Sequence, residues 1–180
     1  MKATGRCLNS AKSSVIVLAM MMICWPVSVR AAQKAGTNSE AAPGLHTITS
    51  QFKRIVVVRM KNQMDILQGL RDAVAREKIK NAVILSGAGS LVSYHIHVVS
   101  NTTLPATEAF TKGDGPFDLL TANGYIIEGR VHCHISFANT EKALGGHLEP
   151  GTRVFTFAII TLGVLEEGAS LKRMDDQTWR

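Results

Sequence analysis

Three histidines near the middle of the chain have the residue type and spacing of a metal site. His132 and His134 are separated by one residue, and because side chains alternate between the two faces of a strand, both project from the same side. His147 follows Gly145-Gly146, and glycines allow the tight turning that would bring this third imidazole back to the pair. Three neutral histidines with a fourth position left to water or ligand describe an open, zinc-type site.

The chemistry of such a site needs further groups. A divalent ion lowers the pKa of bound water toward about 7 and so generates a nucleophile. Hydrolysis or lyase chemistry would also need a general base, for which Glu149 and Glu128 are the acidic candidates. Arg130 and Arg153 are the candidates for holding a small anionic ligand. The ordinary alternative for each carboxylate is a solvated surface position, and a strand histidine is more often hydrogen-bonded than metal-bound.

A second histidine pair and a cysteine also bear on this candidate site. A second His-x-His pair, His95 and His97, lies in the predicted strand Leu91–Val99. This pair could extend the first site, form another one, line a subunit contact, or lie on an exposed polar face. Cys133 lies between two histidines and therefore points to the opposite side, so we expect it in the apolar interior as a small hydrophobe.

The motifs around these histidines resemble the plant-and-prokaryote-conserved (PPC) domain family, over about Gln51 to Glu167. The resemblance implies a compact α+β domain, trimeric, with the three histidines clustered as a metal site, zinc being the expected ion. Plant members join the domain to AT-hooks, and bacterial relatives are labelled DNA-binding. His95 and His97 are a departure from the family pattern. The matching motifs are His132-Cys133-His134, Gly145-Gly146-His147-Leu148, Pro150-Gly151, and Gly115-Pro116-Phe117-Asp118-Leu119-Leu120.

Residues 1–31 have the pattern of a secretory signal peptide. The apolar run Val15–Trp25 follows three basic residues, and small or β-branched residues favour cleavage after Ala31. The run is short for a membrane span of about 20 residues, although an uncleaved anchor is the alternative. We therefore expect a secreted or periplasmic protein that has no membrane contact after cleavage.

Cleavage would change the charge and the cysteine content of the chain. Four basic residues and no acidic residue would be lost, which lowers the formal net charge from +6 to about +2 and gives little attraction to nucleic acid. Cys7 and Cys24 would leave as well, so Cys133 would have no partner for an intramolecular disulfide.

The remaining chain is predicted as one α+β domain over 49–168, preceded by a flexible linker (32–48) and followed by a polar tail (169–180). The pattern Ile66, Leu67, Leu70 and Val74 predicts the main amphipathic helix. β-Branched strands predict a mixed, largely antiparallel sheet. Trimerisation rests on the family resemblance alone.

Local signals predict the details of these elements. Asn62 is expected to cap the helix, with Asp65 in its first turn. Ser86–Ser90 is expected to be a glycine-rich turn and Asn123-Gly124 a hairpin turn. Asn101–Lys112 is predicted as a loop. The predicted strands are Thr47–Met60, Asn81–Leu85, Leu91–Val99, Leu119–Thr121, Tyr125–Glu128, Arg130–Phe137 and Arg153–Leu165.

Three hypotheses for function stay open at this point. The first is an exported metal-binding domain with hydrolytic activity or ligand binding at the ion. The second is DNA binding, against which stand the absent AT-hook, the small net charge and the signal peptide. The third is a non-catalytic trimeric module for protein interaction, in which a metal would be structural.

Overall fold

The computed structural model describes residues 38–42 and 44–176; the predicted signal peptide lies outside these residues. Its secondary structure is almost entirely β. The elements are β1 (Asn38–Ala42), β2 (Leu45–Ile48), β3 (Phe52–Lys61), α1 (Ile66–Arg76), β4 (Ala82–Val99), β5 (Glu108–Ile127), β6 (Arg130–Ala138), β7 (Ala143–Leu148), β8 (Arg153–Leu165) and the 3₁₀ helix η1 (Lys172–Asp175).

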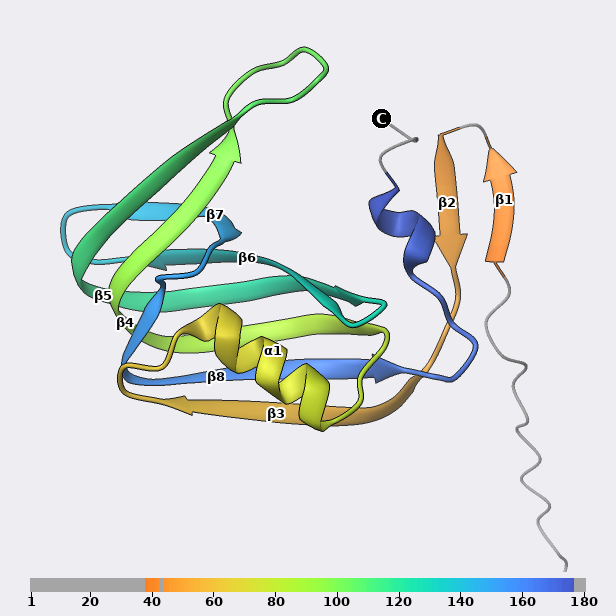
Figure 1. The fold of residues 1–180 in the computed structure, drawn as a ribbon, viewed down its shortest axis with the longest axis horizontal. Helices are drawn as coiled ribbons and strands as arrows, with labels where there is room; N and C mark the ends of the chain where they lie inside the picture. The colour runs from red at the N-terminus through yellow and green to blue at the C-terminus, as the bar shows by residue number, and fades with distance from the viewer. Residues whose placement is uncertain (1–37, 43, 177–180) are drawn as a thin grey trace, which may run out of the picture. The chain divides into compact units, whose positions relative to one another are not determined.

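Six strands form one sheet in the order β3-β8-β4-β5-β6-β7, and every pairing in it is antiparallel (Figure 1). β1 and β2 pair separately as a two-stranded antiparallel ladder, within the segment predicted as a linker. The largely antiparallel sheet with a single α-helix confirms the predicted fold, while the trimeric state stays a prediction. In the described part of the chain, no helix is long and apolar enough to cross a membrane.

The long strand β4 has two different neighbours along one edge. Its first part, from Ala82 to Ser93, pairs with β8, and its far end pairs with β7 through Ile96 and His97. Its other edge pairs with β5. Because β7 also pairs with β6, strands β4, β5, β6 and β7 close into a ring of hydrogen-bonded neighbours.

The glycine-rich segment predicted as a turn lies inside β4, so that prediction is wrong. A Cβ on Gly87 would lie 2.4 Å from the Cβ of Ala122, and one on Gly89 would lie 2.2 Å from the carbonyl oxygen of Phe157. The register with β8 also shifts between Gly89 and Leu91. The glycines therefore serve close strand packing and a bulge, which are the other uses of glycine within a strand.

The predicted Asn123-Gly124 hairpin turn is wrong for a similar reason. Both residues are paired within β5, and a Cβ on Gly124 would lie 2.1 Å from the carbonyl oxygen of His132. The chain turns instead at Glu128 and Gly129, with φ values of 48° and 82°, the two positive values of a type I′ hairpin. Strand β5 also begins at Glu108, within the segment Asn101–Lys112 that the sequence predicted as a loop.

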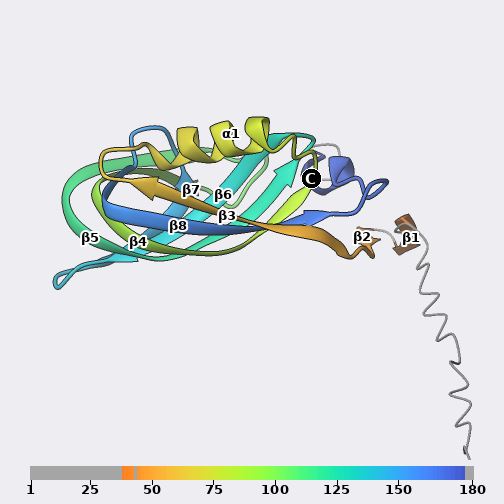
Figure 2. The ribbon, with the colours of Figure 1, turned by 90° about the horizontal axis from the view of Figure 1, so that it is seen from below.

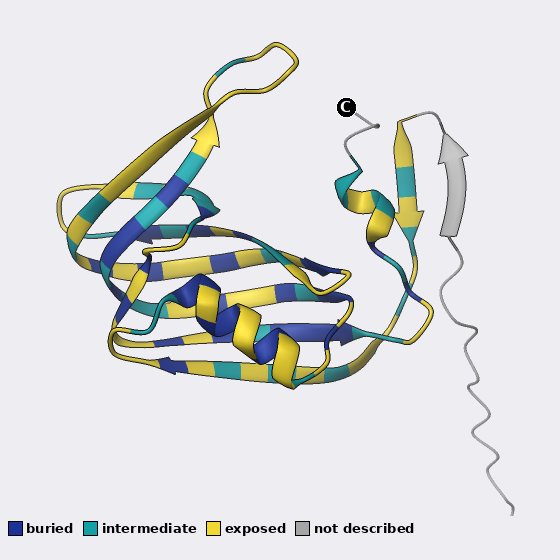
Figure 3. Cartoon of the chain, viewed as in Figure 1, coloured by how far each residue is buried: buried dark blue, intermediate teal, exposed yellow. Residues whose placement is uncertain are grey.

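Helix α1 covers one face of the sheet (Figure 2). Ile66, Leu67, Leu70 and Val74 are buried as predicted, and Figure 3 shows the alternation of buried and exposed residues along the helix. The predicted cap is wrong: Asp65 is the N-cap, and its side chain accepts a hydrogen bond from the Gln68 amide (2.9 Å). The Asn62 side chain donates to the Phe155 carbonyl instead.

The core lies between α1 and the sheet and continues inside the ring of strands. Cys133 is buried there, as predicted. Burial raises the pKa of its thiol to about 12, since the apolar surroundings disfavour the thiolate. The largest fully buried side chains are Phe137, Met60, Ile66, Leu70, Ile84, Leu91, Ile126, Leu148, Ile160 and Leu162.

Asn81 ties the segment after β8 to the sheet. Its side-chain amide donates to the Ala169 carbonyl (3.0 Å), and its side-chain oxygen accepts from the Leu171 amide (3.4 Å). Ala169 and Leu171 are buried. The first residues of the predicted polar tail are therefore packed against the domain.

Candidate metal centre

The strand ladder places three histidines in one row across three strands. His97 of β4 is directly opposite His147 of β7, and His147 is directly opposite His134 of β6. The row continues to Asn123 of β5, which is opposite His134. Directly paired residues carry their side chains on the same face of a sheet, so the closed ring of strands brings these groups together.

The three histidines predicted as ligands lie side by side. Their ring centres are separated by 5.3 Å (His132 to His134), 5.0 Å (His132 to His147) and 5.2 Å (His134 to His147). The strand alternation accounts for the first pair, and the β6–β7 pairing accounts for the approach of His147. His132 and His147 are half-buried, whereas His134 is exposed.

Two further residues join this cluster. The Glu149 carboxylate oxygen Oε1 lies 2.7 Å from Nδ1 of His97 and 3.3 Å from Nδ1 of His147. The ligand atoms of these three residues all lie within 4.8 Å of one another, and they are the one such His/Cys/Asp/Glu group in residues 44–176. The atoms of this group are thus closer together than those of the predicted trio. We call His97, His132, His134, His147 and Glu149 the histidine cluster.

Sequence reasoning left the role of His97 open because its neighbour depends on a distant pairing. The sequence signal for a role of His97 was the second His-x-His pair. Only the pairing of β4 with β7, 50 residues later, turns His97 toward the cluster, while His95 lies one pleat further back along β4.

Electrostatics favour the neutral imidazole at His134. Although His134 is exposed overall, partial desolvation of its ring by the neighbouring groups lowers its pKa, and the positive charges that His147, His132 and His97 can carry lower it further. A neutral imidazole has a free nitrogen lone pair, which is the form that binds a metal. Cys133, with its raised pKa and its place on the opposite face, is not part of this donor set.

Two of the predicted site residues lie elsewhere. The Glu128 carboxylate, in the β5–β6 turn, accepts hydrogen bonds from the Asn81 amide (3.0 Å) and the Ser170 hydroxyl (3.2 Å). The bond from Asn81 is the main cause of a lowered pKa at Glu128. Arg130 is exposed and lies 3.5 Å from a carboxylate oxygen of Asp175. Both residues thus bind groups outside the cluster.

Arg153 lies beside the cluster rather than in it. Its Nε donates to the Ser93 hydroxyl (3.3 Å). It lines a small hollow of about 260 Å³ together with His95 and Lys112. Arg153 therefore lines a hollow next to the cluster.

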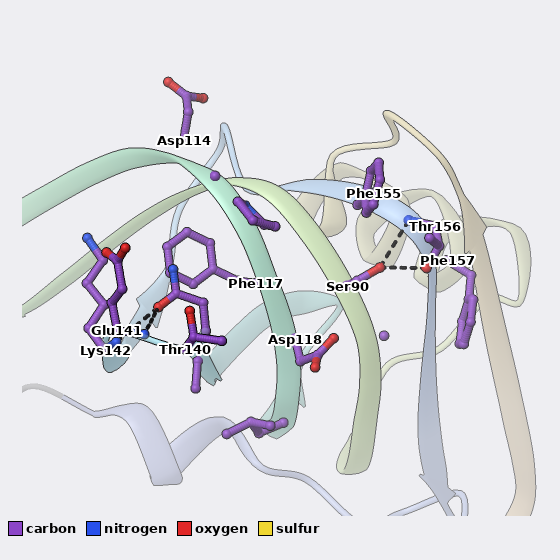
Figure 4. A pocket seen from close by; sticks show the side chains of 16 residues that line it. Ser90, Asp114, Phe117, Asp118, Thr140, Glu141, Lys142, Phe155, Thr156 and Phe157 are labelled. Carbon is purple, nitrogen blue, oxygen red and sulfur yellow. Dashed lines mark hydrogen bonds between the residues drawn. The ribbon is translucent and has the colours of Figure 1, made fainter.

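A larger hollow of about 870 Å³ contains none of the cluster histidines in its lining. Figure 4 shows its acidic residues Asp114, Asp118 and Glu141 at separate places around the rim. Lys142 extends over the rings of Tyr94 (5.8 Å) and Phe117 (5.7 Å). Because these charged groups do not converge on one point, the histidine cluster is the stronger candidate for a reactive site.

Comparison with known proteins identifies the fold. The model of the Plants and Prokaryotes Conserved (PCC) domain matches residues 47–166. A PPC protein from Pyrococcus horikoshii is 24% identical, with a TM-score of 0.57, and the match covers 68% of this chain and 85% of that one. A metal-containing protein from Archaeoglobus fulgidus is 17% identical, with a TM-score of 0.58, covering 67% and 86%.

A curated relative is a much longer protein. The bifunctional protein GlmU from Synechococcus sp. (strain JA-3-3Ab) is 25% identical over 126 residues, which cover 69% of this chain and 19% of that protein. The chain thus spans about a fifth of the length of this relative.

Proposed function

Because the chain belongs to the Plants and Prokaryotes Conserved domain family, the PPC family of its sequence motifs, we propose that it is an exported PPC-domain protein that binds a divalent metal ion at the histidine cluster. The ligands are His132, His134 and His147, and zinc is the expected ion. Bound there, the ion would act as a Lewis acid and would lower the pKa of a bound water. This chemistry suits the hydrolysis of a small molecule or the binding of a small ligand.

The spacing of the three imidazole rings is the observation that carries this proposal. Zinc binds histidine nitrogen at about 2.0–2.1 Å, and the ring centre lies about 1.2 Å beyond the nitrogen, so tetrahedral ligation separates ring centres by about 5.2 Å. The separations in the cluster are 5.0, 5.2 and 5.3 Å. The ligand atoms of His132, His134 and His147 do not all lie within 4.8 Å of one another, so ligation by all three requires their rings to rotate about the side-chain bonds.

Glu149 supports the same assignment as a positioning residue. A carboxylate only accepts hydrogen bonds, so the proton of His147 resides on Nδ1, which faces Glu149 at 3.3 Å. The Nε2 atom of His147 is then the free ligand atom. Metal-bound histidines commonly donate their second nitrogen to a carboxylate in this way. The cluster therefore fits a metal in its donor types and in the support of one donor.

The alternative ligand set is His97, His147 and Glu149, whose ligand atoms lie within 4.8 Å of one another. The two sets share His147. They differ in whether His97 binds the metal or only shares the Glu149 carboxylate with His147. Single substitutions at His97 and at His132 separate them, because each residue belongs to one set alone.

The metal content of the purified protein is the test. The mature protein would be purified without chelator or nickel affinity, and its metals would be measured by inductively coupled plasma mass spectrometry. We expect near-stoichiometric zinc or another divalent ion, and its loss in a His132→Ala/His134→Ala double variant. His46→Ala on β2 is the matched control and should keep the metal. Absence of metal from the wild type, even after zinc is added back, would reject the proposal.

Export is the second part of the proposal and rests on residues 1–31 of the sequence. Expression of the full chain in a bacterial host, followed by fractionation and intact mass measurement, tests it. We expect a periplasmic product that begins after Ala31. A cytoplasmic product of full mass would contradict it.

Assembly into a homotrimer is the third part, and an exposed apolar surface supports it. The sheet face away from α1 carries several exposed apolar side chains on β3 and β8: Ile55, Val57, Phe155, Phe157 and Ile159. A contiguous apolar surface of this kind commonly marks a protein interface. Light scattering coupled to size-exclusion chromatography should give three times the mass of the chain, and replacing Val57 by Glu should lower that mass.

A further inference from the structure

A small hollow lies next to the histidine cluster on the same face of the sheet. Ser93, His95, Lys112 and Arg153 are among the residues that line its volume of about 260 Å³. Ser93, His95 and His97 alternate along β4, so they share a face. His97 lies two residues beyond His95, which is about 7 Å along a strand. The hollow is thus one pleat away from the cluster.

Two basic side chains from different strands give the hollow its positive charge. Lys112 of β5 is directly opposite His95, and Arg153 of β8 is directly opposite Ser93. In residues 44–176 the Lys112 side chain makes no hydrogen bond or ion pair. Arg153 donates a hydrogen bond through Nε, which leaves its terminal nitrogens available. Asp114 is the one acidic residue in the lining, so positive charge prevails.

His95 is fixed in place and lies on β4 between Ser93, which lines the hollow, and His97 of the cluster. Its Nδ1 lies 2.8 Å from the Pro150 carbonyl oxygen, which only accepts, so Nδ1 donates this bond. Its ring contacts that of Phe110, with centres 5.8 Å apart, and the same Phe110 ring contacts His97 at 5.1 Å. Phe110 is 56% exposed. It therefore offers an apolar surface that runs from the hollow to the cluster.

We propose that this hollow binds the anionic group, a carboxylate or a phosphate, of a small ligand whose other end reaches the histidine cluster across Phe110. Lys112 and Arg153 hold the anion, because an arginine fork and a lysine ammonium form charge-assisted hydrogen bonds with oxyanions. A volume of about 260 Å³ accommodates such a group but not a drug-sized molecule. Binding of the other end of the ligand at the cluster rests on the proposed metal function, whereas anion binding in the hollow does not.

Anion titration of the metal-free protein tests the hollow. Inorganic phosphate and acetate would be titrated separately by isothermal titration calorimetry into the wild type, Lys112→Met and Arg153→Met. We expect saturable binding of at least one anion, and a Kd at least ten-fold higher in each variant. The preferred anion distinguishes a phosphate ligand from a carboxylate ligand. Arg71→Met, which removes an exposed positive charge from α1, is the matched control and should bind like the wild type.

Two results would overturn the proposal: no saturable binding of either anion, or equal binding in the wild type and both hollow variants. Arg153→Lys keeps the charge and should bind more tightly than Arg153→Met, which separates loss of charge from loss of folding. The His132→Ala/His134→Ala variant should retain anion binding. If the wild type binds anion but no metal, the metal function fails alone; if it binds metal but no anion, the hollow proposal fails alone.

Discussion

His97 and His147 lie directly opposite each other on β4 and β7, with stacked rings 4.5 Å apart and both Nδ1 atoms facing the same oxygen of Glu149. Their side chains are 16% and 22% exposed, and that of Glu149 is 21% exposed. A carboxylate that holds two imidazoles in this way fixes the tautomer of both rings. Nε2 of His147 is then available as a ligand atom, whereas Nε2 of His97 lies 3.6 Å from Oε1 of Glu108.

This arrangement separates the two candidate ligand sets by experiment. If His132, His134 and His147 bind the metal, His132→Ala should lower zinc affinity more than 100-fold, because a ligand is lost. His97→Ala should lower it by only about 10-fold, the smaller effect of an outer partner. Zinc competition with a chromogenic chelator measures both affinities. The reverse order would assign the metal to His97, His147 and Glu149.

The two acidic residues considered as general bases should behave differently. Glu149→Gln should lower zinc affinity by about 10–100-fold, because the amide holds His147 less well than the carboxylate. Glu128→Gln should leave zinc affinity unchanged, because Glu128 binds Asn81 and Ser170 instead. The same chelator competition on both variants provides the comparison. Equal losses would show that the β5–β6 turn also supports the site.

The lowered pKa of His134 predicts how the metal-free protein responds to acid. The folded state favours the neutral ring, so its stability contribution is present above the ordinary pKa of 6.5 and is lost as the pH falls through the lower folded value. In ¹H–¹⁵N NMR titrations we expect His134 to titrate below 6.5. Its midpoint should rise in His147→Ala, which removes a neighbouring positive charge. A midpoint above 6.5 in the wild type would contradict this.

Cys133 should be unreactive in the folded protein. The residue is 1% exposed and the pKa of its thiol is raised to about 12, so almost no thiolate exists at pH 8. We expect no reaction with Ellman's reagent until guanidinium unfolds the chain. The favourable contribution of the neutral thiol is present below its unfolded pKa and is lost as the pH rises toward about 12. Rapid labelling of the native protein would refute this account.

Asp65 should contribute more to stability than Asn62. Asp65 caps α1 through the Gln68 amide, and its second carboxylate oxygen accepts from the Gly151 amide (2.6 Å). Removal of an N-cap side chain costs about 1 kcal/mol, so Asp65→Ala should lower the free energy of unfolding by at least about that amount. Asn62→Ala is the matched comparison, since Asn62 makes a single exposed bond to Phe155. Urea denaturation of both variants measures the difference.

The sequence by itself determined the features that depend on neighbours a few residues apart. The alternation of a strand placed His132 and His134 on one face and Cys133 on the other, and helical periodicity identified the buried stripe of α1. The motif around Gly145, Gly146 and His147 identified the family. These signals are local, because they follow from backbone geometry that any strand or helix shares.

Only the tertiary structure decided the features that depend on distant strands. Ser86–Ser90 and Asn123-Gly124 have the composition of turns, yet both lie within long strands because their glycines accommodate the close approach of Phe157 and His132. His97 joined the cluster, and Arg153 the neighbouring hollow, through pairings of β4 with β7 and β8. Strand register between distant segments is set by the packing of the whole sheet, and local spacing does not encode it.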